Sequence, residues 1–137
     1  MLDYTEFRRL TETYLRDNFT TCPIKLENLP LPTKDGKGPS SYIAVFDAPA
    51  YAESTGMGET TALKGGTTII QIFVPLNTGT EFTRAIAQEL ADLLENENLG
   101  GIAYGVSELH PAPKSDSWYQ SNLQIPYVLV TGPNDYC

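Results

Sequence analysis

Residues 67–74 constrain the fold of this chain more than any other stretch. They read TTIIQIFV, a run that is apolar on both faces and rich in β-branched side chains. Such a composition is typical of a central strand that is covered on both sides. Pro75 follows directly and ends the run. We therefore expect a sheet whose centre lies here.

A helix-forming pattern comes next. Thr78 and Glu81 have the spacing of a capping box, and Gly100 with Gly101 predicts the end of the helix. Between them, apolar side chains recur at helical spacing: Phe82, Ile86, Leu90, Leu93 and Leu94. Charged residues, Arg84 and Glu89 among them, occupy the remaining helix surface. Residues 102–106 resume as a strand, so this succession resembles a crossover unit with two parallel strands.

The N-terminal residues predict another helix, over residues 3–18. Its apolar positions recur at helical spacing and are Tyr4, Phe7, Leu10, Tyr14 and Leu15. The other face carries Arg8, Arg9 and Arg16. Three arginines in an acidic protein are either a solvated surface or a contact with a neighbouring subunit.

The remaining strands are predicted by alternation of apolar and polar residues. Short strands are expected over 22–27 and 42–46, and a longer one over 118–130. The longer strand sets Leu123, Ile125, Tyr127 and Leu129 on one face and Gln120, Asn122 and Gln124 on the other. Residues 110–116 are expected to form a turn before it, and Pro126 implies an edge or a bulge within it.

Trp118 and Tyr119 are neighbours in that strand, so their side chains should point to opposite sides of the sheet. At least one of them is then expected to face something other than the main core.

The fold class that follows is α+β, with a single mixed β-sheet of about five strands packed by two helices. A chain of 137 residues buries one core but does not divide comfortably into two. Residues 1–137 are therefore expected to form a single domain.

Residues 49–66 are small, polar and rich in glycine and threonine, which predicts a long mobile loop or a hairpin tip. Loops of this length inside a compact domain are usually functional or disordered. Thr55, Gly56, Met57 and Thr60 are therefore candidate contact residues. The alternative is an ordinary flexible connection between two strands.

The charge of the chain limits its partners. The net charge is -8, and residues 81–137 hold eight acids against two bases. A surface of this sign repels phosphate backbones, so no sequence-specific nucleic-acid partner is expected, whereas a basic protein surface would suit it. Acidity that serves solubility alone is the other interpretation.

The sequence carries no visible signal for secretion or for crossing a membrane, so no membrane partner is expected. The two cysteines, Cys22 and the terminal Cys137, are interpreted as free thiols in a reducing cytoplasm.

The residue types that catalyse reactions or bind metals do not form a known catalytic or metal-binding motif. The single histidine, His110, has no carboxylate or cysteine at a spacing that predicts a metal cluster or a catalytic triad. Cys22 is better interpreted as a buried structural residue, and residues 35–41 lack the spacing of a phosphate-binding loop. We expect no catalytic, cofactor or metal site. A small-molecule binding or hydrolytic domain would require a site assembled from scattered residues.

Several segments resemble the tail terminator-like proteins of tailed bacteriophages. They are residues 70–75 (IQIFVP) with Gly79 and Thr80, residues 87–94 (AQELADLL), residues 116–123 (DSWYQSNL) with 125–127 (IPY), and residues 14–19 (YLRDNF). The resemblance extends over nearly the whole chain in the right order. Its motifs are structural, and none is a catalytic signature.

The resemblance implies a small subunit that assembles into a ring, usually a hexamer, on the last ring of tail-tube protein. Such a cap stops tube growth and provides the surface on which the neck of the filled head docks. The expected location is the virion, after assembly in the host cytoplasm. A head-completion or neck protein is the alternative within the same class. Residues 52–66 do not match the family.

Interface residues are not fixed by a family motif, so the candidates come from the residues themselves. They are exposed charges, loop residues and aromatics: Arg8, Arg9, Arg16, Thr55, Gly56, Met57, Thr60, Arg84, Glu89, Trp118 and Tyr119.

Overall fold

The computed structural model describes residues 4–26, 41–54, 62–75, 81–112 and 118–131. The elements in chain order are α1 (Tyr4–Asn18), β1 (Ile24–Lys25), β2 (Tyr42–Ser54), β3 (Ala62–Pro75), α2 (Glu81–Leu94), β4 (Asn98–Leu99), β5 (Ile102–Tyr104), β6 (Glu108–Pro111) and β7 (Trp118–Thr131). The chain therefore has the predicted α+β class, and α1 lies where the N-terminal pattern places a helix.

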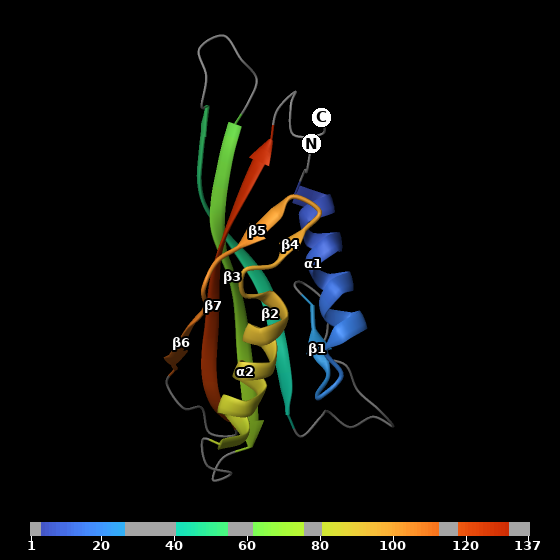
Figure 1. Cartoon of the computed structure of the whole chain (residues 1–137). Helices are drawn as coiled ribbons and strands as arrows, with labels where there is room; N and C mark the ends of the chain where they lie inside the picture. Colours follow the sequence, from blue (N-terminus) through green and yellow to red (C-terminus); the bar gives the residue numbers. More distant parts are fainter. Residues whose placement is uncertain (1–3, 27–40, 55–61, 76–80, 113–117, 132–137) are drawn as a thin grey trace.

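One twisted sheet of seven strands forms the body of the molecule (Figure 1). Its order is β1-β2-β3-β7-β5-β4, and β6 pairs with β7 next to β5. β1 is parallel to β2, and the other pairings are antiparallel. The mixed sheet with two helices is confirmed. It exceeds the expected five strands because β4 and β6 are too short to show an alternating pattern.

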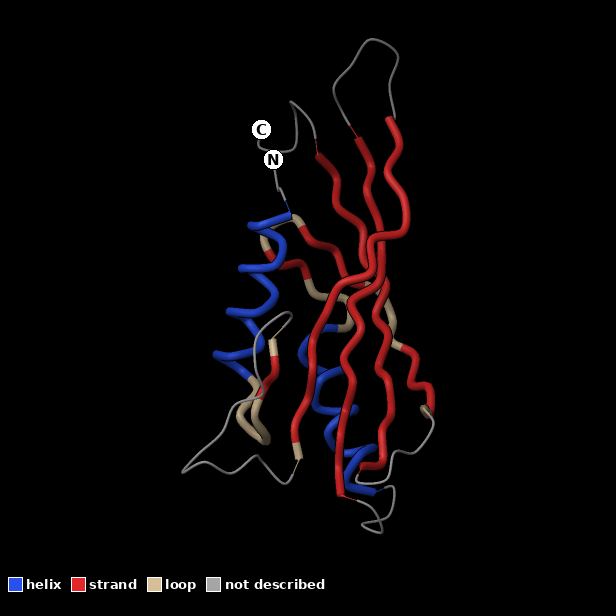
Figure 2. The backbone as a smooth tube through the Cα atoms, turned by 180° about the vertical axis from the view of Figure 1, so that it is seen from behind, coloured by secondary structure: helices blue, strands red, loops and turns tan. Residues whose placement is uncertain are grey.

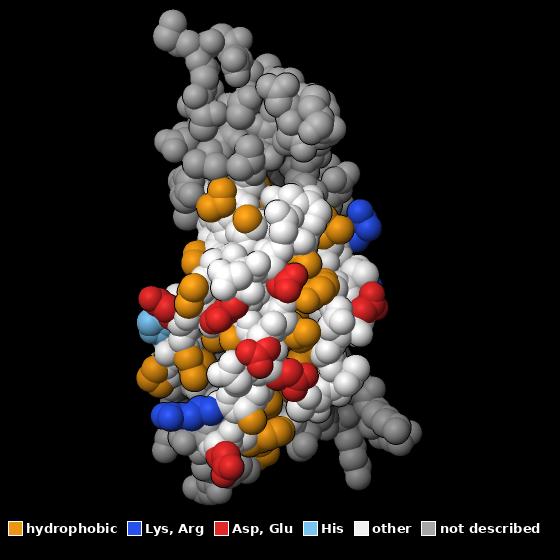
Figure 3. All heavy atoms as spheres, viewed as in Figure 1, with side chains coloured by type: hydrophobic (Ala, Val, Ile, Leu, Met, Phe, Trp, Pro, Cys, Tyr) orange, Lys and Arg blue, Asp and Glu red, His pale blue; other side chains and the backbone are white. Residues whose placement is uncertain are grey.

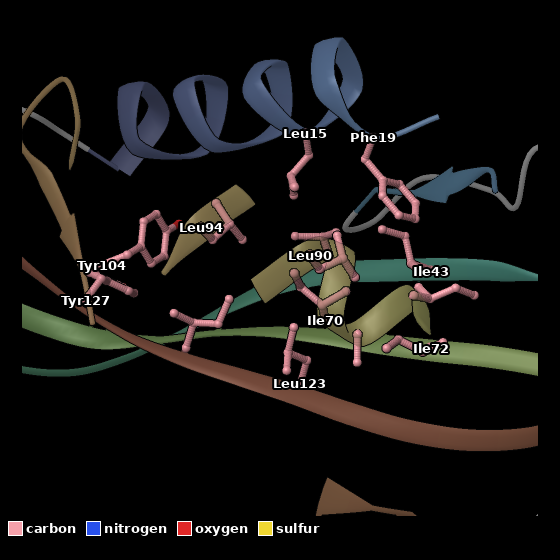
Figure 4. Packing of buried hydrophobic residues seen from close by; sticks show 14 of the residues in the cluster. Leu15, Phe19, Ile43, Ile70, Ile72, Leu90, Leu94, Tyr104, Leu123 and Tyr127 are labelled. Atoms are coloured by element: carbon pink, nitrogen blue, oxygen red, sulfur yellow. The ribbon is translucent and has the colours of Figure 1, made fainter. Parts of the chain in front are cut away.

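Both helices lie on the same face of the sheet, and the hydrophobic core fills the space between the helices and the sheet (Figure 4). Leu15 of α1 and Phe19, which follows this helix, point down into the core, and Leu90 of α2 lies between α1 and the sheet. The fully buried side chains of the sheet include Ile43, Ile70, Ile72, Ile102, Leu123 and Ile125. Residues from both halves of the sequence thus form one continuous core, as expected for a domain with one layer of helices packed on one sheet.

The central strand β3 is buried on one face only, so the prediction of cover on both sides is wrong. Thr68, Ile70, Ile72 and Val74 are buried, whereas the residues between them are partly exposed. Figure 2, seen from behind, shows the long strands in front of α2, with α1 to one side. Because both helices pack on one face, no helix among the described residues covers the other.

The segment 49–66 is largely strand, so the prediction of a long loop is wrong, whereas the alternative of a hairpin agrees with the antiparallel pairing of β2 and β3. β2 continues to Ser54 and β3 begins at Ala62; residues 55–61 lie outside the described part of the chain. β3 pairs here with β2 on one side and with β7 on the other. Two hydrogen-bonding neighbours offset the weak strand propensity of residues such as Gly65. A register shift between Pro49 and Tyr51 marks a bulge or irregularity in the pairing of β2 with β3.

The second helix ends at Leu94, earlier than predicted. Asn96 adopts a left-handed conformation (φ 59°) and turns the chain away. Gly100 and Gly101, with φ of 60° and 108°, form the tight turn between β4 and β5 instead of ending the helix. Gly100 also lies close to α1, since a Cβ at this position would be 3.2 Å from Leu10 Cδ1.

The predicted turn at residues 110–116 is wrong in its first part, because His110 and Pro111 belong to β6 and pair with β7. The predicted strand over residues 22–27 is reduced to the short β1 in the part that the structure describes.

The two strands of the expected crossover unit, β3 and β5, run in the same direction as predicted, but they do not pair with each other. β3 and β5 are both antiparallel to β7, so they run the same way. β7 lies between them, and they are not neighbours. The C-terminal strand has therefore inserted into the centre of the sheet.

Pro126 is in this interior strand, at neither an edge nor a bulge. It lies level with the gap between β5 and β6, where its carbonyl accepts a hydrogen bond from the backbone N–H of Gly105 at 2.8 Å. The nitrogen of a strand residue points to the same side as its carbonyl. The N–H that proline lacks would therefore point into this gap, and the pairing with β3 is not interrupted.

Candidate functional site

The uncovered face of the sheet carries an aromatic cluster of Tyr42, Phe73 and Trp118. The Tyr42 and Phe73 rings are stacked with centroids 4.6 Å apart. The Trp118 ring meets Tyr42 edge-on at 5.3 Å, and its centroid is 6.4 Å from that of Phe73. Tyr119 packs against the core on the opposite face. The expectation that these two neighbours point to opposite sides is therefore confirmed.

Beside this aromatic cluster is a shallow groove of about 320 Å³ along β1, β2 and β3. Lys25 and Leu26 line its edge, and Phe46 and Gln71 line its floor with two of the aromatic rings. Burial raises the pKa of the Tyr42 hydroxyl. The groove thus combines apolar surface, an amide and one basic group.

A second groove runs between α2 and β6 on the helix side of the sheet. Its wider part, about 390 Å³, is lined by Ala87, Ala91, Leu109 and Leu123, with Glu95 and Ser107 at one end. Its narrow part, about 140 Å³, is lined by Thr83, Arg84, Leu109, Pro111, Tyr119 and Ser121. Arg84 and Leu109 line both parts. We call these two parts together the α2–β6 groove.

The narrow part of this groove gathers polar side chains. The Thr83 side chain is 1% exposed, and its hydroxyl oxygen is buried without a hydrogen-bond partner among the described residues. Most buried polar groups in proteins do have such a partner. Arg84 is exposed at the mouth, and Ser121 is buried. Two of the predicted interface residues, Arg84 and Tyr119, are thus brought together here.

The wide part ends at a fixed carboxylate. Glu95 accepts hydrogen bonds from the backbone N–H of Ser107, at 3.0 Å, and from the Ser107 hydroxyl. These two hydrogen bonds lower the pKa of Glu95, because they stabilise the charged form.

Three of the arginines predicted as interface residues, Arg8, Arg9 and Arg16, lie on α1, at the edge of the molecule away from β6 (Figure 1). Arg8 forms an ion pair with Glu12 at 2.8 Å. Arg9, Arg16 and Asp17 are exposed. This helix therefore presents charges of both signs at its outer surface.

Glu89 is engaged within the subunit. It accepts a hydrogen bond from the Thr21 hydroxyl at 2.6 Å. Burial and the nearby Glu89 carboxylate raise the pKa of the Cys22 thiol to about 11. Cys22 is buried, as the sequence predicts, and its thiol stays protonated at neutral pH.

His110 is exposed on β6, with its Nε2 atom 3.2 Å from Glu108 Oε2. Among the residues that the structure describes, no group of three or more histidine, cysteine or acidic residues is placed to hold a metal ion. Neither helix in the described ranges is long and apolar enough to span a bilayer.

The remaining predicted contact residues, Thr55, Gly56, Met57 and Thr60, lie outside the described ranges. Sequence reasoning missed Thr83, Leu109 and Ser121. One signal was present, since Thr83 precedes Ile86 and Ala87 by three and four positions and so shares their buried helix face. A polar residue on an apolar helix stripe indicates a buried hydroxyl.

No family model matches this chain, and no curated protein matches it. Among solved structures, 21 chains match. One of them, whose name states no function, aligns with a TM-score of 0.63 at 17% sequence identity. The alignment covers 93% of this chain and 98% of the other. At this identity the likeness shows the fold alone, and it extends over the full length of a separately determined structure.

Proposed function

We propose that this chain is a structural virion protein of a tailed bacteriophage. It forms a ring at the head-proximal end of the tail tube, stops tube polymerisation and joins the tail to the neck of the head. The observation that carries this proposal is the ordered resemblance to tail terminator-like proteins. The described residues of these segments fall mainly in β3, α2, β7 and α1, which contribute to the core.

The surfaces of the subunit support a ring. A subunit in a closed ring needs two different lateral surfaces that fit each other, because each copy meets the next head to tail. α1 and the α2–β6 groove lie at different sides of the molecule (Figure 1). The uncovered sheet face, with its aromatic cluster, is a further surface on which an adjoining ring docks.

Charge supports a basic partner. Figure 3 shows acidic side chains spread over the helix side of the molecule, with few basic ones. The net charge of the chain is -8. The tail tube protein and the neck or head-completion proteins are the proposed partners, and a basic surface on either of them complements this chain.

The test is to stop translation of this chain in the phage that encodes it and to measure tails by electron microscopy. A terminator predicts tails of irregular or excessive length without heads, because nothing caps the growing tube. Supplying the wild-type chain from a plasmid should restore normal particles.

The same experiment distinguishes a terminator from the alternative, a head-completion or neck protein. A neck protein acts after the tube is capped, so its loss leaves tails of normal length that are not joined to heads. Normal particles at normal yield would contradict both assignments.

A further inference from the structure

We propose that the narrow part of the α2–β6 groove binds the Asp17 carboxylate of a second copy of this chain. The α1 edge of one subunit then docks against the α2–β6 edge of the next. This inference rests on the proposed ring and names the contact that closes it.

The first argument is the set of hydrogen-bond donors in the narrow part. The Thr83 hydroxyl is buried and has no partner in the described chain, while Arg84, Tyr119 and Ser121 line the same space. An unsatisfied buried polar group is costly, and a guanidinium binds carboxylates well. Because the Thr83 hydroxyl has almost no accessible surface, the exposed Arg84 guanidinium is the donor that an incoming carboxylate meets first.

The size of the space indicates what enters it. The narrow part encloses about 140 Å³. Pockets for drug-sized ligands are about 300–1,000 Å³. The narrow part by itself therefore has room for one side chain from another protein surface.

Apolar surface frames these donors. Leu109 is 40% exposed and borders the narrow part, and Ala87, Ala91 and Leu123 continue into the wide part. Figure 3 shows apolar side chains grouped along this flank. When a partner covers them, water is excluded and the ion pair inside becomes stronger than it is in bulk solvent.

The second copy supplies a suitable carboxylate on its opposite edge. Among the described side chains of α1, the carboxylates are Glu12 and Asp17. Arg8 already holds Glu12. Asp17 is exposed and forms no ion pair within the described chain. Of the two carboxylates that the structure describes on this helix, Asp17 is therefore the one available to a neighbour.

The two surfaces of this contact are different: α1 presents Asp17 beside the exposed Arg16, and the α2–β6 groove presents Arg84. Because the two patches differ, the contact is heterologous and builds a ring when the rotation closes.

The decisive test is a charge swap. Arg84→Glu alone and Asp17→Arg alone should each weaken subunit association by roughly 100-fold, because each sets like charges against each other in a covered site. The double variant restores the pair with reversed polarity and should recover infectious titre and normal tail length. Thermal melting of each purified variant checks that the subunit remains folded.

A second test measures proximity directly. Asp17→Cys and Arg84→Cys are combined in a Cys137→Ser background, and assembled particles are oxidised. Non-reducing gels should show a ladder that ends at the closed ring. The matched control combines Arg9→Cys with Arg84→Cys. Arg9 lies eight positions earlier on α1, about 12 Å along the helix, so this pair should not cross-link.

The outcomes separate this inference from the proposed function. If loss of the whole chain causes overgrown tails but Arg84→Glu assembles normally, the contact is wrong and the terminator function stands. Failure of the double variant to recover, with both single variants folded and defective, also overturns the contact. Normal tails after loss of the chain overturn the function itself.

Discussion

Tyr104 shows how one side chain holds three elements together. Its hydroxyl is hydrogen-bonded to Thr11 of α1 at 3.0 Å and to Thr68 of β3 at 3.1 Å, while its backbone belongs to β5. All three residues are buried. β5 and the first helix are thereby fixed to the centre of the sheet through polar contacts that the low-dielectric interior strengthens.

Replacing this tyrosine by phenylalanine should destabilise the fold. Tyr104→Phe removes one hydroxyl and leaves those of Thr11 and Thr68 without their shared partner, which should cost about 1–3 kcal/mol in the free energy of unfolding. Urea denaturation measures it. Tyr42→Phe is the matched control, since no hydrogen bond of the Tyr42 hydroxyl is found in the described chain. Equal stability of the two variants would show that the Tyr104 network contributes nothing.

The Cys22 thiol predicts a pH dependence of stability. Its pKa is raised from 9.0 to about 11, first by burial and then by the Glu89 carboxylate. A thiol whose pKa is higher in the folded state favours folding fully below pH 9, and this contribution is lost as the pH rises through about 11. The unfolding free energy of the wild-type chain should therefore fall more steeply between pH 9 and 11 than that of Cys22→Ala. Parallel curves would contradict the buried thiol.

At the residue scale, the sequence predicted which side chains are buried in the core better than it predicted which side chains meet in the α2–β6 groove. The alternation around Leu123 and the helical spacing around Leu90 identified core positions, because a core position needs only the right period. The grouping of Thr83 with Tyr119 was not predictable. These residues come from α2 and β7, and their contact depends on where the C-terminal strand inserts.

At the element scale, α2 contributes Ile86, Ala87, Leu90 and Leu94 to the core. Leu90 is fully buried and points between α1 and the sheet (Figure 4). Leu90→Ala should leave a cavity and lower the unfolding free energy by about 2–5 kcal/mol. Gln88→Ala, on the exposed side of the same helix, is the control and should change it by less than about 0.5 kcal/mol. A Leu90→Ala loss no larger than the control would contradict the packing.

The strand boundaries show where sequence patterns are insufficient. Residues 49–54 and 62–66 lack the alternation of a half-buried strand, yet they lie in β2 and β3. Their backbone pairing is set by long-range neighbours, since Ala62 pairs with both Ser54 and Thr131. Gly100 and Gly101 show the reverse case. The sequence pattern predicted that they end the helix, but their positive φ serves a hairpin turn between β4 and β5.

At the scale of the whole molecule, the two helices occupy one face of the sheet and leave the other to the aromatic cluster. The sequence predicted the class, the two helices and the main strands from local periodicity. It did not predict the open face, because the apolar run of β3 looks the same whether a helix or a partner covers it. The sequence likewise did not predict the positions of the α1 edge and the α2–β6 groove, because these depend on the order of the strands in the sheet.

The most direct measurement of the central claim is cryo-electron microscopy of the head–tail junction in the intact particle. The account predicts a closed ring of this chain, a hexamer, on the last ring of the tail tube. Within it, α1 of each copy lies against the α2–β6 groove of the next, with Asp17 beside Arg84. A junction without this chain, or one in which its copies do not contact each other laterally, would contradict the account.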